Sequence, residues 1–199
     1  MNLWWLVVAA AGVLALSSSV VVARRPAISG AESRVFRAVN GLPDWLYVPL
    51  WLPMQLGNLV VGTATGLVVA LIDDDLAVAI GVVLAMALKL VTERLIRHEM
   101  ADALAVRQRP GTSQPGAILR GNDVPSSGPS FPSGHVILVA AVGSVVAPNL
   151  RAAWWWLPIL LILLVMVGRV YVGAHNPLDV TAGLGAGLIL GGVLATFVE

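Results

Sequence analysis

Uncharged apolar runs long enough to cross a membrane recur along the chain. The first run, Leu3 to Ala23, carries no charged side chain and ends at Arg24 and Arg25. A helix that crosses the hydrocarbon core of a bilayer needs roughly 20 mainly apolar residues. No Lys or Arg precedes this run and no small-x-small cleavage pattern follows it. The pattern therefore favours a membrane span over a signal peptide.

The next apolar region is interrupted near its start. A short amphipathic segment, Glu32 to Asn40, precedes an uncharged stretch from Trp45 to Ile72 that contains Pro49 and Pro53. Prolines disfavour one continuous helix, and aromatic residues collect at the level of lipid headgroups. We expect an interfacial segment that leads into a second span over about residues 56–72.

Four further spans follow an acidic turn at Asp73, Asp74 and Asp75. They are expected over Leu76 to about Thr92, Pro132 to Val146, Trp154 to about Val172, and Pro177 to Val198. One long connection, Glu93 to Phe131, holds five arginines, four prolines and four glycines, which is typical of a structured polar cap. The sequence predicts an all-α polytopic membrane protein with six transmembrane helices, forming one domain over residues 1–199.

Composition agrees with this reading and excludes several classes of protein. The 199 residues are 58% hydrophobic and 12% charged, against about 45–50% and about 25% for soluble domains. The formal net charge of +1 gives no basic field for a nucleic-acid partner. The chain has no cysteine, which excludes a disulfide framework, a thiolate nucleophile and Cys-ligated metal. The expected partner is the bilayer itself.

The first candidate for chemistry opens the fourth span, at Pro132, Ser133, Gly134 and His135. Proline and serine favour a helix start, and glycine allows close backbone approach. The free N–H groups and the dipole of such a helix end attract anions such as phosphate. His135 lies in the same first turn, where it could donate or accept a proton. A capped helix whose histidine bonds to a neighbour is the structural alternative.

A second candidate joins the fifth and sixth spans. With Asn176 as cap and Pro177 in the first helical position, Asp179 lies in the first turn and faces back toward His175. A carboxylate so placed can orient the imidazole, although it can also merely complement the helix dipole. Arg169 lies inside an apolar span, where an arginine either snorkels or meets an anion. Six spans place all these groups at one membrane face, together with the arginines of the long connection.

These residues resemble the type-2 phosphatidic acid phosphatase family, which shares its site with vanadium haloperoxidases. That family has three motifs, Lys-x6-Arg-Pro, Pro-Ser-Gly-His and Ser-Arg-x5-His-x3-Asp. The second is intact at residues 132–135, and the third spans residues 168–179 with Gly168 in place of serine. The first is incomplete, because Arg109-Pro110 supplies its end but Asp102 stands where the family has lysine.

The resemblance implies a metal-independent phosphatase that needs no cofactor. In such a family member His175, oriented by Asp179, attacks phosphorus to form a phosphohistidine, and His135 protonates the leaving oxygen. The implied phosphate-binding groups are Arg109, Arg169, Ser133, Gly134 and Lys89.

Lys89 is the only lysine in the chain, and we take it as the first substitute for the missing motif lysine. Arg97 and Arg107 are alternatives. A simple i,i+4 ion pair between Lys89 and Glu93 is as well supported by the sequence as contact with phosphate. His98 matches no motif and is expected at the membrane interface.

A site at span ends lies level with headgroups, so the resemblance implies a lipid phosphate as substrate: phosphatidate, phosphatidylglycerophosphate, or a polyprenyl phosphate or diphosphate. We expect an integral protein of the plasma (inner) membrane. The sequence leaves open a catalytically degenerate protein that binds lipid phosphate, and favours a transporter less because the polar groups gather at span ends. The arginines that place the site on the cytoplasmic face by the positive-inside rule are Arg24, Arg25, Arg34 and Arg37, against Arg151 on the other side.

Overall fold

The computed structural model describes residues 3–25, 27–102, 107–122 and 124–198. In these ranges the chain is helical apart from turns and one isolated β-bridge between Gln108 and Pro129. The expected all-α class is confirmed. The helices are α1 (Leu3–Ala23), α2 (Gly30–Asn40), α3 (Tyr47–Met54), α4 (Leu59–Ile72), α5 (Leu76–Asp102), α6 (Pro110–Ser113), α7 (Gly134–Val146), α8 (Trp156–Tyr171) and α9 (Pro177–Val198).

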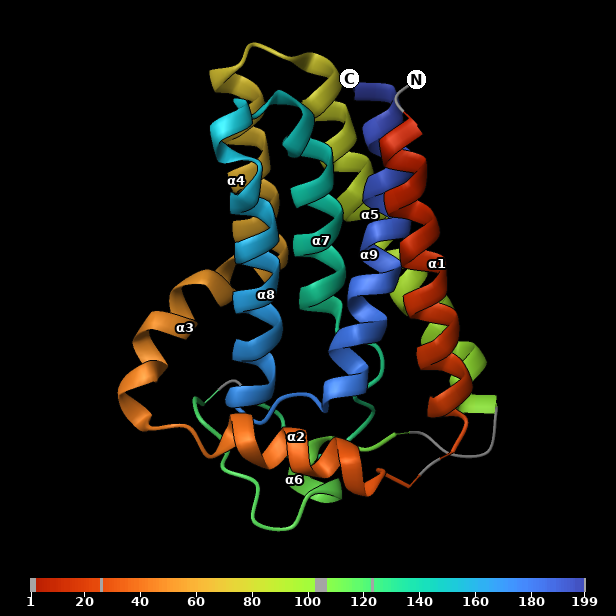
Figure 1. Cartoon of the computed structure of the whole chain (residues 1–199), viewed down its shortest axis with the longest axis vertical. Coiled ribbons are helices and arrows are strands. Elements are labelled where there is room, and N and C mark those ends of the chain that lie inside the picture. The colour runs from red at the N-terminus through yellow and green to blue at the C-terminus, as the bar shows by residue number, and fades with distance from the viewer. Residues whose placement is uncertain (1–2, 26, 103–106, 123, 199) are drawn as a thin grey trace.

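Six of these helices form an upright bundle, and the other three lie toward one end of it. Figure 1 shows α1, α4, α5, α7, α8 and α9 running along the long axis, with α2 and α6 beneath them and α3 diverging to one side. Helix α7 is central, because it packs against α4, α5, α8 and α9 and almost all of its residues are buried. Its lower end begins further into the bundle than the neighbouring ends of α8 and α9 (Figure 1). The polar connections gather below this recessed end.

Four helical segments of the described chain are long and apolar enough to cross a membrane: Leu3–Ala23, Leu76–Glu99, Ala152–Tyr171 and Pro177–Val198. The pair formed by Asp44–Gly57 and Leu59–Ile72 makes a fifth if it counts as one broken span. The expected number of six is not confirmed, because α7 has 13 residues, about 20 Å of helix against a hydrocarbon core of about 30 Å.

Two boundaries within the bundle test the sequence reading. The segment before the second span, Asp44–Gly57, is bent 75° from Leu59–Ile72, which confirms that this region is not one continuous helix. The bend follows Gly57, whereas Pro49 and Pro53 both lie inside α3, so the prolines do not mark the break. The expected end of the third span near Thr92 is wrong, since α5 continues to Asp102. Its charged residues pair along the helix, Lys89 with Glu93 and Glu93 with Arg97, so they extend the helix instead of ending it.

Helix α9 packs closely on both sides because it is rich in glycine. A Cβ added to Gly185 would lie 2.5 Å from the Leu16 backbone nitrogen of α1, and one added to Gly187 would lie 2.6 Å from the Ile137 carbonyl oxygen of α7. The amphipathic helix α2 inserts Phe36 into a core that it shares with Val136 of α7. These contacts hold α9 against α1 and α7, and α2 against α7.

Candidate active site

The turn between α8 and α9 holds His175 beside the end of α8. The carbonyl oxygen of Arg169 accepts hydrogen bonds from the backbone nitrogens of Ala174 (3.1 Å) and His175 (3.2 Å). Gly173 makes this turn possible with a φ of 77°, which costs glycine little and a side chain much. Arg169 and His175 are both buried, so the turn brings a cation and an imidazole together away from solvent.

The starts of α7 and α9 are joined directly through the backbone. The backbone nitrogen of Ser133 donates to the carbonyl oxygen of Asp179 over 3.0 Å. At the start of α9, Pro177 is the first helical residue as expected, and the Asp179 carboxylate accepts from the Asn176 backbone nitrogen over 2.8 Å. This return contact is one half of a capping box. The second and third sequence motifs therefore meet at one place.

The charges around each histidine come from the expected site residues. His135 lies within electrostatic range of Arg169, His175, Lys89 and Arg109. Burial is the main cause that holds the pKa of His175 below its ordinary value of 6.5; Asp179 raises this pKa, and Arg169 and Arg109 lower it further. His175 is consequently a neutral imidazole at pH 7, available as a nucleophile or base.

The expected pair of His175 and Asp179 is present, but it is not a hydrogen bond. His175 Nδ1 and Asp179 Oδ2 are 3.9 Å apart, which is too long. Nδ1 is buried and has no hydrogen-bond partner among the described residues.

Arg107 holds the Asp179 carboxylate from the other side. Its Nε donates to Asp179 Oδ1 over 3.0 Å, and its Nη2 donates to Glu32 Oε1. Glu32 Oε1 also accepts from the backbone nitrogen of Leu178 over 3.0 Å. The sequence offered Arg107 as a cation for phosphate, whereas the structure places it on two carboxylates. Glu32 was not singled out, and its position in an amphipathic helix gave no signal of this contact.

Arg109 joins the site through the same turn. Its Nη1 donates to the carbonyl oxygen of Ala174 over 2.9 Å. Burial lowers the pKa of its guanidinium, as does the charge of Arg97. An anion beside Arg109 would offset both effects. The family's lysine position is Asp102, the last residue of α5, whose side chain lies outside the described part of the structure.

Lys89 forms the i,i+4 ion pair that the sequence left open, with 2.6 Å between its Nζ and Glu93 Oε2. Its charge also reaches His135, so the pair lies at the site and not on a remote face. The other candidate, Arg97, contacts the second oxygen of Glu93 over 2.6 Å. Both cations are thus held by one carboxylate.

Ser133 and Gly134 begin α7, but the serine does not cap it. Ser133 has an extended backbone at the N-cap position and makes no side-chain cap hydrogen bond. Its hydroxyl is buried without a hydrogen-bond partner among the described residues. A buried polar atom without a partner is costly, so this hydroxyl is suited to a ligand that enters the site. His98 is exposed on α5.

A small polar cavity of about 40 Å³ opens beside the site, between α3, α7 and α8. Its lining includes His135, Arg169, Arg120, Gln55 and Trp51. Within the described residues, no group of three or more His, Asp or Glu side chains is arranged to hold a metal ion.

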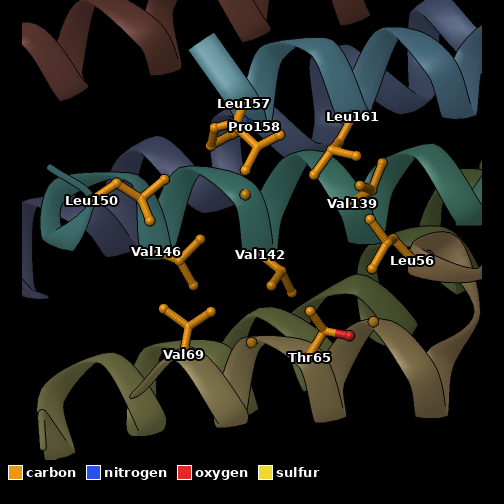
Figure 2. A pocket seen from close by; sticks show the side chains of 13 residues that line it. Leu56, Thr65, Val69, Val139, Val142, Val146, Leu150, Leu157, Pro158 and Leu161 are labelled. Carbon is orange, nitrogen blue, oxygen red and sulfur yellow. The ribbon is translucent and has the colours of Figure 1, made fainter. Parts of the chain in front are cut away.

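A larger apolar groove of about 170 Å³ lies between α4, α7 and α8. Figure 2 shows Thr65 and Val69 of α4 facing Val142 and Val146 of α7, with Leu157, Pro158 and Leu161 of α8 closing one side. Leu56, at one end of the groove, follows Gln55 of the polar cavity in the chain. An apolar chain and a polar headgroup could occupy these two spaces together.

Known proteins are similar to this chain in part of its sequence or in its fold. An undecaprenyl-diphosphatase of Sulfolobus acidocaldarius is 47% identical over 55 residues, which are 27% of this chain and 26% of that protein, so the match spans about a quarter of that relative's length. The crystal structure of Aquifex aeolicus LpxE matches with a TM-score of 0.67 and 21% identity, covering 82% of this chain and 94% of that one. A transmembrane PAP2 type phosphatidylglycerolphosphate phosphatase from Bacillus subtilis matches with a TM-score of 0.64 and 20% identity, covering 98% and 92%.

The same bundle thus occurs in solved membrane proteins, and the long apolar helices identify a multi-pass membrane protein. The family model of the PAP2 superfamily matches residues 76–199. That range contains the predicted site residues His135, His175, Asp179, Arg169 and Arg109. The chain belongs to the PAP2 superfamily.

Proposed function

We propose that the chain is a metal-independent lipid phosphatase that works through a covalent phosphohistidine. The observation that carries this proposal is that the starts of α7 and α9 are joined at Ser133 and Asp179, which brings His135 within electrostatic range of His175, with Arg169 and Arg109 acting on both. Two imidazoles and two permanent cations around a helix start are suited to phosphoryl transfer, which depends on positioning and on stabilising the charge of the non-bridging oxygens.

In the first step, Nε2 of His175 attacks phosphorus and the bond to the lipid oxygen breaks. His135 donates its proton to that leaving oxygen, because the arrival of an anionic phosphate favours the protonated imidazole. Asp179 orients His175 through Nδ1. The distance of 3.9 Å between Nδ1 and the carboxylate shortens when substrate binds, as is common for catalytic hydrogen bonds.

In the second step, water attacks phosphorus and the bond to His175 Nε2 breaks, which releases inorganic phosphate. His135 accepts the proton of the attacking water and is ready for the next cycle. During both steps the phosphate oxygens are held by Arg109, Arg169, Lys89, the Ser133 hydroxyl and the Gly134 backbone N–H.

The substrate is a lipid phosphate whose headgroup enters the polar cavity while its chain lies in the apolar groove. The groove is lined almost wholly by apolar side chains, and such a surface stabilises hydrocarbon by removing it from water or headgroups. The partial match to an undecaprenyl-diphosphatase makes a polyprenyl diphosphate the first compound to assay, ahead of phosphatidylglycerophosphate and phosphatidate.

The test is phosphate release from these three lipids by the purified chain in detergent micelles. We expect release from at least one lipid, its loss in His175→Ala and in His135→Ala, and full activity in His98→Ala. The last variant is the matched control, because His98 is exposed and outside the site. Binding of lipid phosphate without release by the wild type would instead favour the catalytically degenerate alternative.

The site faces the cytoplasm if the positive-inside rule governs this chain. Arg34 and Arg37 are exposed on α2, at the site end, whereas Arg151 precedes α8 at the other end. Because the chain lacks cysteine, Ala38→Cys and Ala152→Cys provide exposed single labels at the two ends. In intact cells, an impermeant maleimide is expected to label position 152 of the plasma-membrane protein and not position 38; the reverse labelling would place the site outside.

A further inference from the structure

The start of α7 already carries an anion, the carboxylate of Glu93. A Cβ added to Gly134 would lie 2.5 Å from Glu93 Oε2 and 2.8 Å from both Oε1 and Cδ. The carboxylate therefore packs directly against Gly134, in space that any larger residue at this position would fill. Helix starts favour negative charge because their N–H groups are unpaired and the dipole is positive there.

The cations around this carboxylate come from two parts of the chain. Lys89 and Arg97, one turn before and one turn after Glu93 on α5, each contact one of its oxygens over 2.6 Å. The negative charge of Glu93 also acts on Arg109. Only 15% of the Glu93 side chain and 12% of the Lys89 side chain are exposed. One carboxylate thus offsets part of the positive charge of the site.

Under the proposed function, three groups near Glu93 bind the phosphate of the substrate. They are Gly134, Lys89 and Arg109. A phosphate dianion and a carboxylate cannot occupy the same few ångströms, since like charges repel strongly in a partly buried site. The Glu93 side chain is long and partly exposed, so its carboxylate can turn outward while α5 stays in place. Its departure would free Lys89 for phosphate.

We propose that Glu93 is an internal competitor for phosphate, whose carboxylate fills the cradle at the start of α7 until a phosphate displaces it. This inference rests on the proposed function for the identity of the cradle. Its consequence is weaker binding of inorganic phosphate, so that Glu93 returns as the product leaves and the site is not blocked by product. A residue that only held Lys89 and Arg97 in position would have the opposite effect, because its loss would weaken phosphate binding.

The test is the affinity of the full-length purified protein for inorganic phosphate and for vanadate, measured by titration calorimetry in detergent. We expect Glu93→Gln to bind both anions at least about 10-fold more tightly than the wild type, because a negative charge has left the cradle. Glu99→Gln is the matched control, since it removes the same charge from an exposed position of the same helix. Its affinity is expected to equal that of the wild type.

An equal or weaker affinity of Glu93→Gln, or an equal gain in Glu99→Gln, would overturn the proposal. If Glu93→Gln does not fold, Glu93→Asp keeps the charge but withdraws the carboxylate from Gly134 by one methylene. A smaller gain in affinity is then expected, and no gain overturns the proposal. Turnover of lipid phosphate, measured alongside, separates the two claims: a gain in affinity without turnover by the wild type refutes only the proposed function, and turnover without that gain refutes only the role of Glu93.

Discussion

Replacing Arg107 with methionine leaves two buried carboxylates, those of Glu32 and Asp179, without the guanidinium that joins them. The side chains of Arg107 and Asp179 are fully buried and that of Glu32 is 9% exposed. Methionine fills similar volume, so the change removes charge and hydrogen bonds more than packing. Removing one partner of a buried ion pair costs about 3–5 kcal/mol, a large part of a total stability of about 5–15 kcal/mol.

The same variant is expected to lower kcat and leave KM nearly unchanged, because Arg107 contacts Asp179 and no substrate group. In this variant Asp179 Oδ1 loses its hydrogen bond from Arg107, so the carboxylate is no longer held in place while its other oxygen faces His175. A displacement of about 1 Å in such a group lowers the rate on the order of 10²-fold. Phosphate release at varied lipid concentration separates the two constants.

Stability is measured by titrating the purified protein in mixed micelles with dodecyl sulfate and following tryptophan fluorescence. Arg151→Met is the control, since this exposed arginine lies at the other end of the bundle. Adding Glu32→Gln to Arg107→Met removes one of the two stranded charges, so the double variant should lose less than the sum of the single losses, by about 0.5–3 kcal/mol. A loss in Arg107→Met no larger than that in Arg151→Met would refute the buried network.

Four further outcomes follow from the site. His135→Ala and His175→Ala are each expected to lower turnover by about 10²–10⁴-fold without changing the unfolding midpoint; wild-type turnover in either would contradict its role. Chelation with EDTA is expected to leave phosphate release unchanged, and inhibition that added divalent metal reverses would contradict the metal-free mechanism. Thr65→Trp, which fills the apolar groove, should raise KM for long-chain but not short-chain lipid phosphates, whereas Val68→Trp, exposed on the same helix outside the groove, should not. Because burial lowers the pKa of His175 and the neutral imidazole is the reactive form, the acid limb of kcat/KM should fall below pH 6.5, and a limb above 6.5 would refute this assignment.

The sequence predicted those features that depend on neighbours along the chain. Apolar runs located α1 and α9 without error. The prolines predicted an interruption before α4, but the bend follows Gly57 and the prolines themselves lie inside α3. The charged residues near the end of α5 led to a wrong prediction, because Glu93 on its own indicates the start of the polar connection. Its i,i+4 ion pairs with Lys89 and Arg97 instead lie along the continuing helix. The depth at which α7 starts depends on how α4, α5, α8 and α9 pack around it, and no local sequence pattern predicts that packing.

The site shows the same division. Spacing within two motifs predicted that His135, Arg169, His175 and Asp179 belong to one site, since the residues of each motif are close along the chain. The contact of Arg107 with Glu32 joins residues 75 positions apart and depends on where α2 docks. The contact of Glu93 with Gly134 likewise depends on α5 packing against α7. Neither follows from a helix pattern or a motif.

The central claim is that the starts of α7 and α9 and the end of α8 enclose one tetrahedral phosphate. A structure of the protein with vanadate bound tests it most directly. The account predicts vanadium bonded to Nε2 of His175, with His135 on the opposite side and the Arg169 and Arg109 guanidinium groups on the equatorial oxygens. Vanadate bound elsewhere, or contacted by one imidazole with the other out of reach, would contradict it.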